Sequence, residues 1–130
     1  MMTLIDTAAW IEFFRSKGNP VQKARVADLL MVGQAAYTCA IRFELFLGAR
    51  PSEIEDLCEG LGFAERIVLL PVHWDTAASY GAELRAKGFI IPASDLLIAA
   101  LAAEEGLELI SPDKHFVTIQ REILPALKLS

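Results

Sequence analysis

Four acidic side chains occupy positions where an isolated charge needs an explanation. Asp6 ends the apolar run "MTLID", and Glu44 lies within the apolar segment "FELFLG". Asp95 opens the apolar stretch "DLLIAALAA", and Asp113 follows the apolar run "LELIS". Carboxylates gathered in one place repel one another, and hard divalent cations such as Mg²⁺ or Mn²⁺ relieve that repulsion. A site of this kind suits metal-assisted attack of water on a phosphodiester.

Three of these acids also have a local structural explanation. Asp6 could cap the helix that follows it. Asp95 could lie in the first turn of a helix capped by Ser94, where the helix macrodipole favours an acid. Asp113 could belong to an ordinary Pro-Asp turn. None of the three positions is specific for function when it is taken alone.

Glu44 is harder to explain without a function, because apolar residues surround it almost completely on the predicted helix. A buried carboxylate must be paired or must bind something. The alternative is an internal ion pair with Arg42 or with a distant basic residue, but Arg42 is two positions away and points in another direction on a helix. We therefore favour a functional role for Glu44.

The elements that must position these acids alternate between strand-like and helix-like segments. This alternation predicts an α/β fold with a mostly parallel sheet. In such a sheet, ligands gather beyond the carboxyl ends of the strands, where three of the acids are expected. The predicted strands are 2–6, 34–40, 65–72 (ended by Pro71), 107–111 and an edge strand in 126–130. The predicted helices are 7–16, 21–33, 40–49 (capped by Thr38), 53–62 (capped by Ser52), 73–88 (closed by Gly88) and 92–106, with a loop at 112–116.

The length and charge of the chain limit its class. The 130 residues suit one domain spanning 1–130, and 54% are hydrophobic. The net charge of −5 argues against a broad basic surface for nucleic acid, but it leaves room for a local metal-bridged site. No apolar run is long enough to span a bilayer, and "MMTLIDTAAW" lacks the basic start of a signal peptide. We expect a cytoplasmic protein that does not enter the membrane.

The two cysteines lack zinc-site spacing and are expected to be reduced. Cys39 is predicted to be a small core hydrophobe, and Cys58 to lie on the apolar side of a helix.

Four blocks of the sequence, "LIDTAAW", "FELFLGA", "IPASDLLIAALAAEEGLELIS" and "SPDKHF", occur in this order. The chain resembles the PIN-domain ribonucleases, and specifically the VapC-type toxins of toxin–antitoxin modules. The third block is the most specific, because it combines an Asp, an Ile-Ala-Ala helix, a Gly, a strand and a Ser-x-Asp motif. The resemblance covers essentially the whole chain.

This resemblance implies a three-layer α/β/α fold around a short parallel sheet and an endoribonuclease activity that uses Mg²⁺ or Mn²⁺. By motif match, the family's acidic residues fall on the same four acids. It assigns supporting roles to the hydroxyls of Thr7 and Ser111. It also implies a homodimer and a cognate VapB-type antitoxin as partner.

The chain departs from the family pattern at one position. Many relatives carry a second acid two residues after the last motif Asp, where this chain has His115. This puts a second metal site in doubt, and an exposed loop histidine is the favoured interpretation. His73 is predicted to begin a helix and is given no role.

Our hypothesis from the sequence is that Asp6, Asp95 and Asp113 hold the metal, with Glu44 completing the ligand set or orienting water. Hydrolysis in line would leave a 5′-phosphate and a 3′-hydroxyl. The candidates for gripping RNA are Lys114, beside the site, and then Arg15, Lys17 and Arg42. The alternatives are a catalytically weak PIN-like binding domain and another metal-dependent phosphoesterase.

Overall fold

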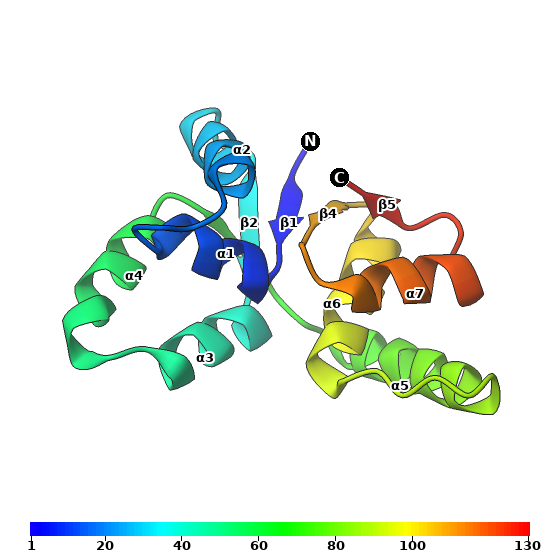
Figure 1. Cartoon of the computed structure of the whole chain (residues 1–130). Coiled ribbons are helices and arrows are strands. Elements are labelled where there is room, and N and C mark those ends of the chain that lie inside the picture. The colour runs from blue at the N-terminus through cyan, green and yellow to red at the C-terminus, as the bar shows by residue number, and fades with distance from the viewer.

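Five short parallel strands form the central sheet in the computed structural model, which describes residues 1–130 (Figure 1). The strand order is β3-β2-β1-β4-β5, and each neighbouring pair is parallel. The predicted mostly parallel sheet is therefore confirmed. The strands are β1 (Thr3–Ile5), β2 (Ala35–Thr38), β3 (Glu65–Ile67), β4 (Glu108–Ile110) and β5 (Lys128–Leu129).

Helices cover both faces of the sheet, as Figure 1 shows. One layer contains α1 (Thr7–Phe14), α2 (Pro20–Met31) and α4 (Ile54–Leu61). The other contains α5 (Pro71–Ala86), α6 (Ala93–Glu105) and α7 (Lys114–Glu122). The remaining helix, α3 (Cys39–Gly48), lies beyond the end of β2, and a 3₁₀ turn (Pro51–Glu53) precedes α4. This arrangement confirms the three-layer α/β/α fold.

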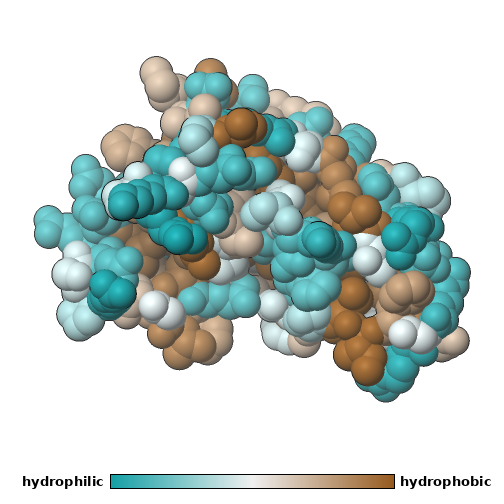
Figure 2. All heavy atoms as spheres, viewed as in Figure 1, coloured by the Kyte–Doolittle hydropathy of each residue, from teal (hydrophilic) through white to brown (hydrophobic).

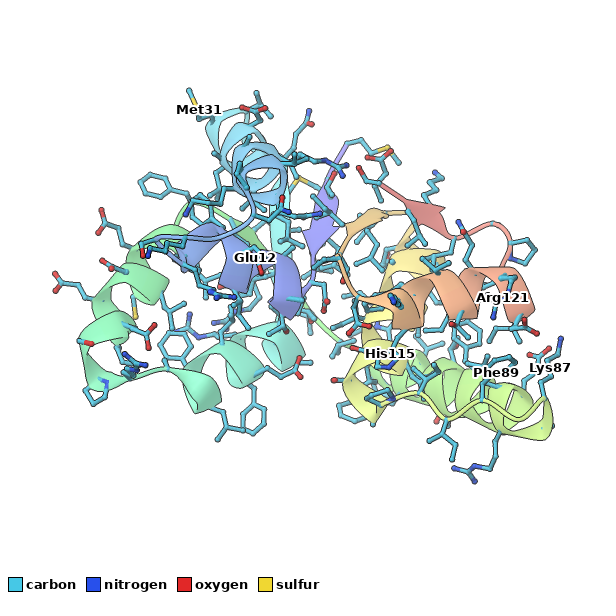
Figure 3. The ribbon with its side chains drawn as sticks, viewed as in Figure 1. Glu12, Met31, Lys87, Phe89, His115 and Arg121 are labelled. Atoms are coloured by element: carbon cyan, nitrogen blue, oxygen red, sulfur yellow. The ribbon has the colours of Figure 1, made fainter.

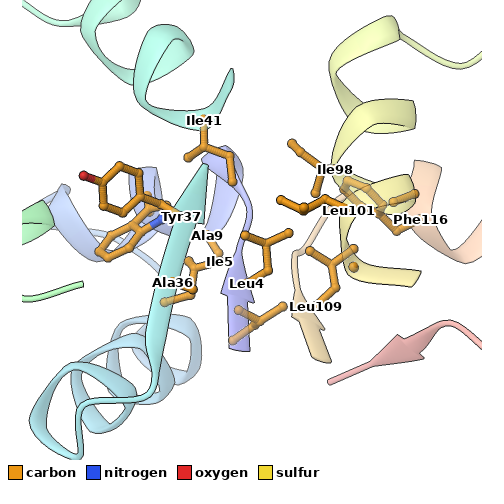
Figure 4. Close-up of a cluster of buried hydrophobic side chains, with 14 of the residues drawn as sticks. Leu4, Ile5, Ala9, Ala36, Tyr37, Ile41, Ile98, Leu101, Leu109 and Phe116 are labelled. Carbon is orange, nitrogen blue, oxygen red and sulfur yellow. The ribbon is translucent and has the colours of Figure 1, made fainter. Parts of the chain in front are cut away.

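Part of the hydrophobic core lies between the central strands and α6 (Figure 4). Leu4, Ile5 and Leu109 from β1 and β4 are fully buried, as are Ile98 and Leu101 from α6. Burying a side chain of this size contributes roughly 1.5–3 kcal/mol, so α6 is fixed firmly against the sheet. Buried residues run along most of the helix: Asp95, Leu97, Ile98, Ala99, Ala100, Leu101 and Ala102. The first turn of α6 is therefore held at a defined place on the rim of the core.

Two predicted boundaries are wrong. The segment 112–116, expected to be a loop, contains the start of α7, which buries Phe116 and Ile119. The strand predicted to end at Pro71 ends at Ile67, and Pro71 instead begins α5. Proline suits this position, because the first helical N–H has no helical partner and the ring already fixes φ.

Several predicted helix caps also differ. Ser52 lies inside the 3₁₀ turn, and Ser94 is the second residue of α6, whose N-cap position is Pro92. Thr38 does occupy the N-cap position of α3, but its side chain makes no capping hydrogen bond. Gly88 follows the end of α5 with φ of 91°, which confirms that a glycine closes this helix.

Both cysteines are free, as expected, but Cys39 and Cys58 are exposed, so their predicted places in the core and on the apolar side of a helix are wrong. None of the helices combines the length and the apolar character that crossing a bilayer requires.

Candidate metal centre

The four acids lie near one another at the carboxyl edge of the sheet. Asp6 directly follows β1, Asp113 lies three residues after β4, and Asp95 is in the first turn of α6. Glu44 lies on α3, which begins directly after β2. Burial raises the pKa of both Asp6 and Asp95, and repulsion adds to the rise, from Asp95 and Glu44 at Asp6 and from Asp113 and Glu44 at Asp95. The structure therefore brings together all four acids singled out from the sequence.

Asp6 is almost completely buried, with 3% of its surface exposed. Its side chain makes no capping hydrogen bond to α1, so local capping does not explain this acid. Instead, the Ser111 hydroxyl donates to Asp6 Oδ2 at 2.7 Å. Burial raises the pKa of Asp6 to about 6, and the Ser111 hydrogen bond opposes that rise. A carboxylate that is costly to ionise in the free protein is one that a cation would stabilise strongly.

Glu44 accepts hydrogen bonds from two other helices. The Thr7 hydroxyl donates to Oε1 at 2.8 Å from the start of α1, and the Ser94 hydroxyl donates to Oε2 at 3.2 Å from the start of α6. Arg42 makes no ion pair with Glu44 and instead lies over the ring of Phe46 at 4.4 Å. No other basic side chain forms an ion pair with Glu44 either, so the internal ion-pair alternative is wrong. Ser94 is a site residue that sequence reasoning treated only as a helix cap.

Asp95 and Asp113 both contact His115, which extends from the start of α7 (Figure 3). His115 Nδ1 lies 2.6 Å from Asp95 Oδ2 and 3.1 Å from Asp113 Oδ1. The backbone N–H of His115 also donates to Asp113 Oδ1 at 2.9 Å, which makes Asp113 the N-cap of α7. Burial raises the pKa of Asp95, and the hydrogen bond from His115 opposes this rise. The favoured interpretation of His115 as an exposed loop residue is therefore wrong.

The donor set fits a divalent cation. Ligand atoms of Asp95, Asp113 and His115 all lie within 4.8 Å of one another. Carboxylate oxygen and imidazole nitrogen are both common ligands of divalent metals in proteins. Asp6 and Glu44 lie outside this tight group, although the charge of Glu44 acts on Asp95 and the charge of Asp95 acts on Asp6. The residues therefore suit a metal bound on the α6–α7 side and faced by further negative charge.

A cleft of about 760 Å³ opens beside Glu44. The basic side chains of Arg15, Lys17 and Arg50 line it, together with apolar residues of α1 and α3. Arg42 lines a separate, smaller cleft of about 530 Å³ with Phe43 and Leu47. Two of the basic candidates therefore share a cleft with Glu44, whereas Arg42 lines the other cleft on α3.

The other histidine, His73, has a structural role in the first turn of α5. It is fully buried, its Nδ1 accepts the backbone N–H of Leu70 at 2.8 Å, and its Nε2 lies 3.1 Å from Glu105. These bonds tie α5 to the end of α6 at a distance from the four acids.

Comparison with known proteins identifies relatives over nearly the whole chain. The PIN domain family matches residues 3–122. A VapC ribonuclease of Mycobacterium bovis and ribonuclease VapC11 of Mycobacterium tuberculosis are each 33% identical over 125 residues. Each alignment covers 92% of this chain and 92% of the relative.

Solved structures share the fold at lower sequence identity. VapBC2 from Rickettsia felis, bound to a promoter DNA fragment, matches with a TM-score of 0.80 at 22% identity, covering 100% of this chain and 98% of that chain. FitAcB from Neisseria gonorrhoeae matches with a TM-score of 0.78 at 20% identity, covering 98% of this chain and 96% of that chain. These similarities extend to the whole three-layer arrangement.

Proposed function

The chain belongs to the PIN domain family, among its VapC-type members, and from this premise we propose that it is a metal-dependent endoribonuclease toxin. The observation that supports the activity best is the convergence of four acids at the carboxyl edge of the sheet. Asp6 is buried there with a pKa raised to about 6, and no lysine or arginine forms an ion pair with any of the four. A divalent cation supplies the missing positive charge.

Asp6, Asp95 and Asp113 would hold Mg²⁺ or Mn²⁺, with Glu44 completing the ligand set or orienting water. When bound, such a cation supplies Lewis-acid chemistry, because it polarises a phosphodiester and makes water a better nucleophile near neutral pH. The chain's own contribution is to place the charges before the substrate arrives. Buried α6 fixes Asp95, and the N-cap bond to the backbone of α7 fixes Asp113.

Neutral hydroxyls orient the remaining two acids. Ser111 donates to Asp6, and Thr7 and Ser94 donate to the two oxygens of Glu44. A hydroxyl donor orients a carboxylate without cancelling its charge, so the acids remain available to a cation. These hydrogen bonds agree with the roles of Thr7 and Ser111 that the resemblance implies. They add Ser94 as a third hydroxyl donor.

The substrate in this proposal is RNA, held through its phosphates by basic side chains near the acids. Arg15 and Lys17 line the cleft beside Glu44, and Lys114 is exposed at the start of α7. Arg42 is less well placed, because it lines the separate cleft on α3. Local contacts of this kind suit a chain whose net charge is −5.

We also propose that the chain forms a homodimer and binds a VapB-type antitoxin. In this proposal the protein acts on its RNA substrate in the cytoplasm. The relatives of known structure include toxin–antitoxin complexes by name, such as VapBC2. On this chain, Phe43 and Leu47 of α3 are 66% and 74% exposed. Figure 2 shows apolar surface along the lower edge of the view, where α3 and α5 lie. Exposed apolar area of this kind is typical of interfaces. The molecular mass of the purified protein in solution tests whether it is a dimer.

Cleavage of RNA by single variants tests the activity. We expect Asp6→Asn, Glu44→Gln, Asp95→Asn and Asp113→Asn each to lower the cleavage rate by roughly 100-fold or more, beyond the usual cost of losing an outer-shell partner. Excess EDTA should abolish cleavage by the unaltered chain. The matched control is Asp28→Asn, because Asp28 is an exposed acid near the end of α2, at the opposite edge of the sheet.

Full activity in EDTA, or in the Asp6→Asn or Asp95→Asn variant, would contradict the proposed mechanism. The second candidate, a PIN-like binding domain without activity, predicts metal binding with no cleavage by the unaltered chain. A thermal shift with added metal, measured beside the cleavage assay, separates these two functions.

A further inference from the structure

His115 adds a nitrogen ligand to a group of side chains that otherwise offers only oxygen. Its Nδ1 faces two carboxylates at once, at 2.6 Å from Asp95 and 3.1 Å from Asp113. Figure 3 shows the side chain at the start of α7, near the first turn of α6. The three ligand atoms lie within 4.8 Å of one another, and none of them comes from a mobile terminus or a long flexible side chain.

The backbone fixes this arrangement. Asp113 caps α7 by accepting the N–H of His115, so the carboxylate and the imidazole are held by the same turn of chain. The amide of Asp113 in turn donates to the Ser111 hydroxyl at 3.0 Å, and that hydroxyl donates to Asp6. Asp95 approaches from α6, which is buried along most of its length. The three ligands therefore come from two rigid helix starts, as a preorganised site requires.

One imidazole cannot balance the charge gathered here. Four carboxylates lie at this edge, and the ion pairs of the chain give them no lysine or arginine partner. If His115 were only a counter-ion for Asp95, the other acids would remain uncompensated. A cation that binds between the three ligand atoms reduces the repulsion for all of them.

The mixed donor set also selects among cations. Mg²⁺ prefers oxygen ligands in near-ideal octahedral geometry, whereas imidazole nitrogen suits transition metals better. We propose that Asp95, Asp113 and His115 form a mixed nitrogen–oxygen site that binds Mn²⁺ in preference to Mg²⁺, with His115 Nδ1 as a direct ligand. This inference rests on the proposed function only in that it places the metal at the same edge of the sheet.

Pulsed electron paramagnetic resonance tests the ligand directly. The metal-free full chain is titrated with Mn²⁺, and we expect ¹⁴N coupling of an imidazole to the bound ion. The chain has two histidines, and His73 is fully buried with both ring nitrogens already engaged. The coupling should therefore vanish in His115→Asn and His115→Asp. Bound Mn²⁺ without nitrogen coupling in the unaltered chain would overturn the proposal, and so would failure to bind Mn²⁺.

Affinities of the same proteins for Mn²⁺ and Mg²⁺ test the preference. His115→Asp replaces the nitrogen ligand by oxygen, so we expect the ratio of the Mg²⁺ Kd to the Mn²⁺ Kd to fall about tenfold. An unchanged ratio would overturn the preference. If His115 acts only as a counter-ion, His115→Asn should bind both metals more tightly, because a competing positive charge is removed, and that outcome also overturns the proposal.

Two further measurements distinguish the absence of the His115 site from unfolding of the variants and from failure of the proposed function. Circular dichroism and Tm in EDTA establish that the His115 variants are folded, which is expected because 41% of this side chain is exposed. RNA cleavage by the unaltered chain, measured with each metal, tests the proposed function by itself. Cleavage without nitrogen coupling contradicts only the His115 site, whereas nitrogen coupling without cleavage contradicts only the ribonuclease activity.

Discussion

The buried carboxyl of Asp6 shows at the level of one residue why the folded protein would favour a bound cation. Its carboxyl is 3% exposed and its pKa is raised from 3.8 to about 6, first of all because of burial. The folded state therefore binds a proton at Asp6 more tightly than the unfolded state does. The contribution of Asp6 to the free energy of unfolding is therefore largest below about pH 4. It falls as the pH rises from about 4 to above 6.

This pH dependence leads to a prediction for the stability of the metal-free chain. The difference between 3.8 and about 6 corresponds to about 3 kcal/mol when Asp6 is fully ionised. Asp6→Asn removes the ionisation but keeps an acceptor for Ser111. We expect this variant to be more stable than the unaltered chain at pH 8 in EDTA, by about 1–3 kcal/mol, with the difference lost near pH 4.

Denaturant unfolding across this pH range measures the effect, with Asp28→Asn as a control that should show no such trend. Adding Mn²⁺ should reverse the order at pH 8, because the bound cation compensates the charge of the Asp6 carboxylate, which only the unaltered chain carries. An Asp6→Asn variant that is less stable than the unaltered chain in EDTA at pH 8 would mean that the charge of Asp6 is already compensated inside the protein.

The helices around Glu44 show what a residue pattern can and cannot predict. The apolar neighbours of Glu44 indicated a buried carboxylate that must be paired or must bind something, but Phe43 and Leu47 are exposed and Glu44 is only half-buried. Its partners were not predictable in the same way, because Thr7 is 37 residues away and Ser94 is 50 residues away along the chain. Local rules favoured Ser94 as a helix cap, whereas the tertiary structure uses its hydroxyl to connect α6 to α3.

The α7 helix was missed for a related reason. "SPDKHF" reads as a turn, since Pro and Asp are turn residues, but the same Asp113 is a helix N-cap once Phe116 and Ile119 can be buried. The residue pattern therefore predicted the parallel α/β sheet and singled out the four acids that gather at its edge, and the family resemblance implied the three layers. The sequence did not reveal that His115 lies in the first turn of a helix beside Asp95, because that contact depends on how α7 packs.

The hydroxyl contacts to Glu44 lead to a prediction about the coupling of helices. Thr7→Val and Ser94→Ala each remove one donor while leaving the helices intact. We expect each variant to lower RNA cleavage by roughly 10- to 100-fold, because Glu44 loses its fixed orientation, while Tm changes little. Cleavage assays and thermal unfolding of the same samples measure both effects.

The control is Thr76→Val, which removes a hydroxyl bond of the same kind, from Thr76 to Glu104 at 3.1 Å on the exposed surface. Its activity should remain unchanged. If Thr7→Val and Ser94→Ala cleave RNA as fast as this control, the orientation of Glu44 does not limit the reaction.

The net negative charge of the whole molecule opposes the binding of RNA. Basic side chains gathered in one place must therefore attract the phosphates. The net charge is −5, yet Arg15, Lys17 and Arg50 gather in the cleft beside Glu44. The Arg15 side chain is 62% exposed, so it can reach a phosphate despite its contact with Glu12. Binding that depends on a few such contacts should show a shallow salt dependence, because few counterions are released.

The double variant Arg15→Gln/Lys17→Gln tests this distribution, in an Asp95→Asn background that prevents cleavage during the measurement. Each lost phosphate contact lowers the slope of log K against log salt by about 0.7 for single-stranded RNA. We therefore expect the double variant to bind more weakly, with a slope reduced by about 1.4. The control is Arg85→Gln, which removes an exposed charge in the last turn of α5 and should leave the slope unchanged. An equal slope in the double variant and the control would show that the phosphates lie elsewhere, and Lys114 would then be the next residue to change.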